Sequence, residues 1–155
     1  IVRPHNVYGP DMGWEHVIPQ FAVRLAGLLA QPDPLPFGLQ GDGSETRAFV
    51  HIDDFTDGLM AVLAKGADRQ IYHLGSQEEI SMADLARRVA ACAGRTLALQ
   101  PGPPAVGGTR RRCPNISKAR ALGYAPRRPL AAGLPAVVAW YLSHADQAPP
   151  SASKS

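Results

Sequence analysis

Proline and glycine divide this chain into short pieces. Of its 155 residues, 15 are glycine and 15 are proline, and many gather in three stretches, PHNVYGPDMG from Pro4, QPDPLPFGLQGDG from Gln31 and PGPPAVGG from Pro101. Both residues interrupt regular elements, so these stretches predict loops. Short helices and strands joined by long loops are typical of an α+β arrangement. Loops longer than about 12 residues in a compact domain are usually binding elements or disordered, and we expect the former.

Between these stretches, apolar residues recur at the spacings of helices and strands. Ser81 and Asp84 form a capping-box-like pair, and Gly94 is placed to end the same helix in a left-handed turn. Asp53 or Asp54 can cap the preceding helix. We expect strands at 1–3, near Leu39, and at 47–52, 70–75 and 96–100; helices at 19–29, 55–65, 82–93, 117–124 and 130–144; and a frayed tail at 145–155.

The composition narrows the class of protein. With 45% hydrophobic and 19% charged residues, the chain can form one compact domain with a real core. Two cysteines, Cys92 and Cys113, are too few for a disulfide framework or a zinc site, so no metal is predicted. The sequence contains neither a signal-peptide pattern nor a span of about 20 apolar residues. A reducing, cytoplasmic setting is predicted.

The chain opens on Ile1-Val2, without a methionine and as though within a strand. We therefore expect it to be part of a longer protein.

Basic residues cluster in TRRRCPNISKA, which places Arg110, Arg111 and Arg112 side by side. Adjacent cations repel one another and fit no core, so this run predicts a local anion site. Arg47 is a second candidate, because it follows the flexible Gly41-Asp42-Gly43 turn and opens a strand. A guanidinium fork suits phosphate oxygens better than the point charge of a lysine.

Four segments together resemble a known family. RPHNVYGPDMG, GDGSETRAFVHIDD, IYHLGSQEEISMADLA and RRRCPNISKARALGYAPRRPL occur in the order found in extended short-chain dehydrogenase/reductases that act on nucleotide sugars. These are the NAD-dependent epimerases, dehydratases and decarboxylases. The resemblance covers positions 1 to 144 and implies an α/β fold class: the last strand of a Rossmann-type sheet plus the small C-terminal substrate-binding domain. It implies that residues 1–12 supply the end of the sheet and an active-site loop and that 13–144 form the nucleotide-sugar-binding domain, and we expect 145–155 to be a disordered tail.

Two signatures of that family are missing from this sequence. The family has a Gly-rich phosphate loop and a Tyr-x-x-x-Lys pair whose tyrosine is the catalytic base. Here the four tyrosines, Tyr8, Tyr72, Tyr124 and Tyr141, are followed four positions later by Met, Ser, Arg and Ala. The chain thus resembles the substrate-binding half alone. We predict no catalytic residue in it and no activity by itself, with NAD bound mostly by an N-terminal Rossmann half and a homodimer when that half is present.

The resemblance also implies roles for individual residues. Arg47 and Arg112 contact the substrate diphosphate from opposite sides, while Arg110 and Arg111 are solvated neighbours. Asn6 contacts the substrate phosphate through its amide. Residues implied to face the cofactor are His5 and Val7; the remaining residues implied to face the nucleotide sugar are His16, Val17, Leu39 and Gln40.

Simpler interpretations stand beside these roles. Asn6 can be a turn residue, His5 a packed histidine and His16 a helix entry, while the apolar residues from Leu35 to Leu39 can anchor a loop to the core. We interpret Asp53 and Asp54 as helix-capping residues and Cys113 as a packing residue, although its neighbouring cations would lower the thiol pKa. Two other function classes remain open: a stand-alone nucleotide-sugar-binding module, and more remotely a basic nucleic-acid-binding domain, suggested by a net charge of +3 and a pI near 9.1.

Overall fold

The computed structural model describes residues 1–104 and 107–150. The chain forms two compact units whose segments alternate along the sequence. The first unit contains Ile1–Gly9, Thr46–Ile80 and Arg111–Gly133; the second contains Pro10–Glu45, Ser81–Arg110 and the chain from Leu134 onward. The functional division expected from the sequence, with a boundary after residue 12, stays a prediction.

The first unit is built on parallel strand pairs. Strand β1 (Val2–Pro4) pairs with β6 (Tyr72–Leu74), and β2 (Val7–Tyr8) pairs with β5 (Val50–His51). A third, three-stranded sheet has the order β7 (Glu79–Ser81), β4 (Thr46–Ala48) and β9 (Arg111–Arg112). Parallel partners require a crossover connection, and helix α2 (Ile52–Lys65) lies in the connection between β1 and β6.

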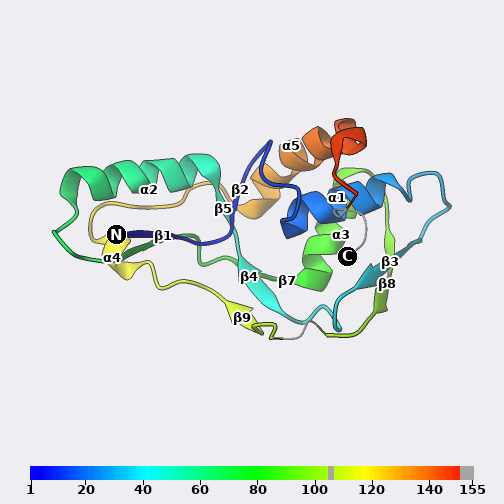
Figure 1. The fold of residues 1–155 in the computed structure, drawn as a ribbon, viewed down its shortest axis with the longest axis horizontal. Helices are drawn as coiled ribbons and strands as arrows, with labels where there is room; N and C mark the ends of the chain where they lie inside the picture. Colours follow the sequence, from blue (N-terminus) through cyan, green and yellow to red (C-terminus); the bar gives the residue numbers. More distant parts are fainter. Residues whose placement is uncertain (105–106, 151–155) are drawn as a thin grey trace. The chain divides into compact units, whose positions relative to one another are not determined.

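Helices α2 and α4 (Ser117–Arg120) pack against the β1–β6 pair (Figure 1). The core of this unit is formed by Leu74, Ile116, Ala119 and Tyr124, with Val2, Phe55, Leu59 and Val62 packed around it. Gly58 lies on the inner face of α2, where an added Cβ would approach the Tyr124 ring to 2.7 Å. This close approach explains the glycine within the helix, despite its poor helix propensity.

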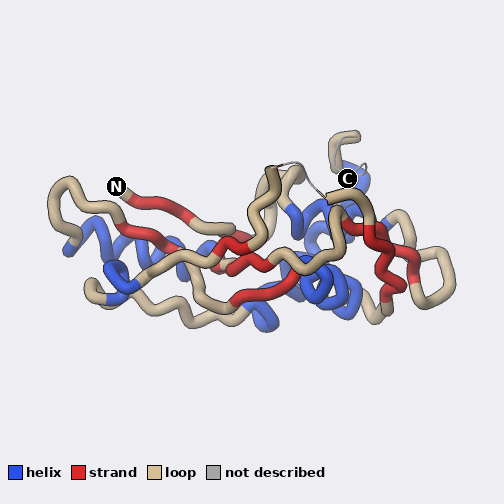
Figure 2. Tube along the Cα trace, turned by 90° about the horizontal axis from the view of Figure 1, so that it is seen from below, coloured by secondary structure: helices blue, strands red, loops and turns tan. Residues whose placement is uncertain are grey.

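The second unit packs two helices against a strand pair. Strand β3 (Leu35–Leu39) pairs in parallel with β8 (Leu97–Pro101), and Figures 1 and 2 both show the two side by side. Its helices are α1 (Val17–Ala26) and α3 (Met82–Cys92). The Phe21 ring of α1 meets the Phe37 ring of β3 edge-on, with centroids 5.4 Å apart. Helix α5 (Leu130–Ser143) contributes Leu134, Val137, Val138 and Tyr141 to the buried residues.

Several expectations from the sequence are confirmed. The Ser81 side chain accepts a hydrogen bond from the Asp84 N–H at 3.0 Å, and Gly94 has a φ of +67°. Other expectations need correction. The expected strand at 47–52 is two strands, β4 and β5. By contrast, the strand expected near Leu39 is present as the five-residue strand β3. The expected tail contains a 3-10 helix, η1 (Ala145–Gln147), while 151–155 lie outside the described residues.

The start of α2 also differs from expectation. His51, rather than Asp53 or Asp54, caps the helix, since its side chain accepts the Asp53 N–H at 3.2 Å. Gly66 follows the helix with a φ of −67°, so it ends α2 without a left-handed turn. The cap is therefore an imidazole, and both carboxylates are left to interact with other groups.

Candidate functional site

Strands β4 and β9 bring the two predicted clamp arginines together. In their parallel register Thr46 is opposite Arg111, and Arg47 is opposite Arg112. Directly paired residues of neighbouring strands project from the same face of a sheet, and successive residues project from opposite faces. Arg47 and Arg112 therefore share one face although they lie far apart in the sequence. Arg112 is exposed and Arg47 is half-buried.

The other face of this sheet carries a row of paired polar groups. Glu79 on β7 accepts a hydrogen bond from the Thr46 hydroxyl at 3.0 Å. The same carboxylate accepts from Arg111, at 2.6 Å from Nη2 and 2.9 Å from Nε. These bonds, first from Arg111 and then from Thr46, lower the pKa of Glu79. The expectation that Arg111 is a solvated neighbour is thus wrong in one respect: the guanidinium is exposed but paired.

The Asn6 side chain is hydrogen-bonded to β4, the strand that carries Arg47. Its Nδ2 donates to the Ala48 carbonyl at 2.9 Å, and its own carbonyl accepts the Val50 N–H at 3.2 Å. The residue has a φ of 42°, in the left-handed region that asparagine tolerates better than most residues. An amide has two N–H donors, so one donor is left after the bond to Ala48. Asn6 is therefore a turn residue that is bonded to the neighbour of Arg47 on β4.

His5 and Val7 lie where parallel sheets bind their ligands. His5 follows the carboxyl end of β1, and its N–H donates to the Leu74 carbonyl at the end of β6. Val7 begins β2 and is half-buried. In open α/β sheets, ligands bind outside the carboxyl ends of the strands. His5 and Val7 thus both follow the carboxyl end of β1, and their contact with a cofactor stays a prediction.

The His5 side chain has a partner of its own. Its Nε2 lies 2.6 Å from Nδ1 of His73, on the neighbouring strand. Burial lowers the pKa of His5, and the charges of His73 and Arg3 lower it further. The neutral imidazole is therefore favoured at neutral pH, with one ring nitrogen engaged by His73.

Gly75 lies between His5, at this end of the sheet, and Pro114, which follows the run Arg110–Arg112. A Cβ on Gly75 would come within 2.7 Å of the Pro114 side chain and 3.0 Å of the His5 Cβ. Pro114 is two residues after Arg112. Only a residue without a side chain lets the two segments approach so closely. The His5 segment and the segment that follows Arg112 are therefore packed closely around Gly75.

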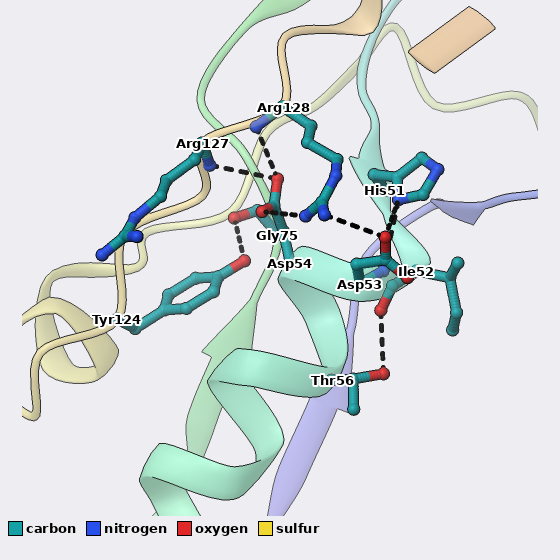
Figure 3. A network of polar contacts seen from close by, with 9 residues as sticks. All are labelled: His51, Ile52, Asp53, Asp54, Thr56, Gly75, Tyr124, Arg127 and Arg128. Carbon is teal, nitrogen blue, oxygen red and sulfur yellow. Dashed lines mark hydrogen bonds and ion pairs between the residues drawn. The ribbon is translucent and has the colours of Figure 1, made fainter.

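A buried carboxylate supports the chain that follows α4 (Figure 3). The Asp54 side chain is 2% exposed and accepts the backbone N–H groups of Arg127, at 3.1 Å, and Arg128, at 2.8 Å. The Arg128 guanidinium lies between both aspartates, 3.4 Å from Asp54 and 3.1 Å from Asp53. The Tyr124 hydroxyl donates to the Gly75 carbonyl at 2.8 Å. Asp54 is thus a structural anchor, a role not predicted from the sequence.

The sequence does contain a signal for this anchor. Asp54 lies four positions before Gly58, and such residues share a helix face. The carboxylate is therefore on the inner face of the expected helix, where an unpaired charge is costly. The adjacent Asp53 has no such relation to Gly58 and is exposed.

The second unit holds the remaining predicted site residues. His16 precedes α1 and is exposed, with no capping hydrogen bond from its side chain, and Val17 is the first residue of that helix. Leu39 is 7% exposed at the end of β3, so its side chain belongs to the core, whereas Gln40 is exposed. The burial of Leu39 agrees with the packing alternative. Because the Leu39 side chain is buried, only its backbone is left to contact a nucleobase.

Neither metal binding nor thiol chemistry is supported by the side chains described. Among those residues, no three His, Cys, Asp or Glu side chains are grouped so that they could hold a metal ion. Both cysteines are free thiols. Burial raises the pKa of Cys113, and Glu79 raises it further. Arg111 lowers this pKa, as expected from its charge, but the two raising effects are larger. Within the described part of the chain, no helix is long and apolar enough to cross a bilayer.

Comparison with known proteins identifies the family. Residues 1–75 match the model of the NAD dependent epimerase/dehydratase family. The dTDP-4-dehydro-6-deoxy-D-allose reductase of Streptomyces bikiniensis is 33% identical over 147 residues, which are 93% of this chain and 43% of that protein. The GDP-mannose 3,5-epimerase of Arabidopsis thaliana is 34% identical over 145 residues, or 90% of this chain and 37% of that protein.

A solved structure is similar in both sequence and fold. The dTDP-glucose 4,6-dehydratase of Streptomyces venezuelae, with NAD and TYD bound, is 32% identical with a TM-score of 0.80, over 96% of this chain and 45% of that one. The chain belongs to the NAD-dependent epimerase/dehydratase family of extended short-chain dehydrogenase/reductases, whose cofactor is NAD. The predicted family and α/β fold class are confirmed. The chain spans less than half the length of these relatives.

Proposed function

We propose that this chain forms the nucleoside-diphosphate-sugar-binding part of an NAD-dependent enzyme that modifies nucleotide sugars. The relatives named above act on sugars linked to dTDP or GDP. They include a reductase, an epimerase and a dehydratase at similar identity, so the proposal concerns the substrate class and not one reaction. The chain lacks the Tyr-x-x-x-Lys pair, and we propose that it is inactive alone.

One observation carries the proposal: Arg47 and Arg112 are register partners on one face of a sheet. Two guanidinium groups at neighbouring positions of paired strands can bind the two phosphates of one diphosphate, each with charge-assisted hydrogen bonds. The middle arginine of the local run, Arg111, projects from the opposite face toward Glu79. The basic run therefore contains one group positioned for an anion and one that already has a carboxylate.

The first unit also fits NAD. His5 and Val7 lie past the carboxyl end of a parallel strand, where they can form one wall of a dinucleotide site. Gly75 allows the backbone to approach closely at the same sheet end. NAD, when bound, would supply hydride transfer. The phosphates of NAD are not assigned to residues of this chain, which contains no Gly-rich phosphate loop.

The contribution of the chain to catalysis is positioning. Holding the diphosphate fixes where the attached sugar lies, and a fixed geometry lowers the entropic cost of reaction. Arg47 and Arg112 would hold the phosphates, and the second N–H of the Asn6 amide would bond the same group. The second unit would contribute its predicted nucleotide-sugar contacts from His16, Val17, Leu39 and Gln40. A cytoplasmic setting and a homodimer in the longer protein remain part of the proposal.

Arginine variants test this proposal by titration calorimetry with UDP and dTDP. The protein should be expressed with whatever sequence its gene encodes upstream of Ile1. Arg47→Lys keeps the charge but loses the fork, so binding should weaken by roughly 1 to 3 kcal/mol. Arg112→Ala should have a similar effect. The double variant should lose less than the sum, because both groups hold one ligand.

Arg110→Lys is the matched control, and its affinity should equal that of the unchanged protein. A second control replaces the nucleotide with tripolyphosphate, which carries charge without a nucleoside. Equal, additive losses at Arg110, Arg111 and Arg112, with tripolyphosphate bound as well as UDP and a steep salt dependence, would instead indicate a diffuse basic patch.

A further inference from the structure

His5 and His73 meet on one face of the β1–β6 pair. In the parallel register His73 is opposite Arg3, and His5 is the second residue after Arg3, so all three side chains project from the same face. The N–H of His5 still bonds the Leu74 carbonyl, which continues the ladder past the end of β1. The two imidazoles are therefore diagonal neighbours across the strands, at a separation that aromatic side chains can span.

The His5 ring makes its polar contact with His73. Nε2 of His5 lies 2.6 Å from Nδ1 of His73, and the two ring centroids are 4.9 Å apart with the planes inclined at 42°. Among the residues that the structure describes, no other hydrogen bond to the His5 ring is present. One hydrogen bond therefore directs this imidazole, with its Nε2 turned toward β6.

The same contact links the protonation of the two rings. A neutral imidazole has one N–H donor and one bare acceptor nitrogen. A hydrogen bond between Nε2 of His5 and Nδ1 of His73 needs one proton, on either nitrogen, so the tautomer of one ring is coupled to that of the other. Nδ1 of His5 is the ring nitrogen that is left for another group.

We propose that His73 is a positioning residue, which holds the His5 imidazole with Nε2 turned toward β6 and Nδ1 left for the cofactor. This inference rests on the proposed function, because it takes His5 as part of the NAD wall past the carboxyl end of β1. His73 acts through His5 and not by touching NAD, since its Nδ1 is occupied by the neighbouring ring. The sequence pattern alone indicates no role for His73.

The first experiment observes the contact directly, without ligand. The protein is expressed with whatever sequence its gene encodes upstream of Ile1, with isotope-labelled histidine. An NMR scalar coupling across the N–H···N hydrogen bond should connect Nε2 of His5 with Nδ1 of His73 at about pH 8, above the ordinary imidazole pKa of about 6.5. His5→Phe and His73→Phe assign the signals, and both should lose the coupling. Its absence from the unchanged protein would overturn the proposal.

The second experiment compares two replacements of His73 by NAD calorimetry. His73→Phe keeps a ring but removes the nitrogen, so NAD affinity should fall by about fivefold, as expected when one hydrogen-bonding group is no longer held in place. His73→Asn restores a polar group close to the position of Nδ1 and should keep most of the affinity. Unchanged affinity in His73→Phe would show that ring packing suffices, and would overturn the proposal.

His144→Phe is the matched control for this comparison. His144 is also half-buried, and its Nδ1 lies 2.7 Å from the Trp140 carbonyl, so the replacement again removes one hydrogen-bonded ring nitrogen. Both residues belong to the second unit, whereas the His5–His73 pair belongs to the first. NAD affinity should stay unchanged in His144→Phe, and a loss equal to that of His73→Phe would count against a specific role for His73.

A double-variant cycle shows whether His73 acts through His5. His5→Phe should itself lower NAD affinity by about as much as His73→Phe. Adding His73→Phe to it should then have no further effect, because the group that His73 positions has been removed. Additive losses would mean that His73 acts by another route, which overturns the proposal.

These readouts separate the inference from the proposed function. If the unchanged protein does not bind NAD, the proposed cofactor site fails, whereas the coupling between the two imidazoles still supports the role of His73 in orienting His5. If the coupling is present and NAD binds, but neither His5→Phe nor His73→Phe weakens binding, the pair serves the fold alone and the positioning role is overturned.

Discussion

Two arginine–carboxylate arrangements of the first unit use the same chemistry in different surroundings. Asp54, beside Arg128, has a side chain that is 2% exposed, whereas that of Glu79, beside Arg111, is 29% exposed. Asp54 also accepts two backbone N–H groups and anchors the segment after α4. Glu79 connects three strands at a sheet edge. Removing a partner is costly when a polar group is then left buried and unbonded, and mild when water can replace it. We therefore expect the Asp54 side chain to contribute more to stability than the Glu79 side chain.

The largest expected effect comes from Asp54→Ala. It removes the acceptor of two backbone N–H groups and one guanidinium, so the free energy of unfolding should fall by about 3 kcal/mol. Denaturant unfolding followed by circular dichroism measures this change. Asp53→Ala, at the exposed neighbour, is the control and should have almost no effect. Similar losses from both variants would show that burial does not distinguish the two carboxylates.

A smaller effect is expected from the buried tyrosines. Tyr124→Phe removes the hydrogen bond to the Gly75 carbonyl while keeping the packed ring, so unfolding should become easier by about 1 kcal/mol. Tyr8 is also buried, but its hydroxyl has no hydrogen-bond partner among the described residues. Tyr8→Phe should therefore be neutral or stabilising in the same unfolding experiment. A larger loss at Tyr8 than at Tyr124 would contradict the assigned bonding.

The smallest expected effect concerns the half-buried pair of His5 and His73. The pKa of His5 is lowered from 6.5, so the unfolded chain binds more protons than the folded one in the window just below that value. The stabilising contribution of neutral His5 is complete above pH 6.5 and is lost as the pH falls from 6.5 toward the lowered pKa.

Melting temperatures measured across this window test the sign. The melting temperature of the unchanged chain should fall as the pH decreases through it, and His5→Gln should reduce that slope. A steeper fall in His5→Gln would reverse the sign and contradict the prediction. The half-buried His5 would then not serve as a case between the buried Asp54 and the more exposed Glu79.

Predictions from the sequence were correct where a few neighbouring residues determine the local structure. The Ser81–Asp84 cap and the left-handed Gly94 are contacts within one helical turn, and both are confirmed. The split of 47–52 into β4 and β5 was missed, because it depends on separate partners, β9 and β2. Strand β3 was expected only as a brief piece near Leu39, and its full length was missed, since its pairing partner β8 lies about 60 positions away in a proline-rich context.

The sequence by itself determined the family, the fold class and the arginines to consider. Those follow from residue type and order, since a guanidinium binds phosphate in any fold that presents it. Only the tertiary structure decided which arginine faces which way. Arg111 and Arg112 are adjacent and chemically identical, but alternation along β9 sends one toward Glu79 and the other to the face of Arg47. The same applies to Asp53 and Asp54, because the position of a residue on a helix face and its burial depend on what packs there.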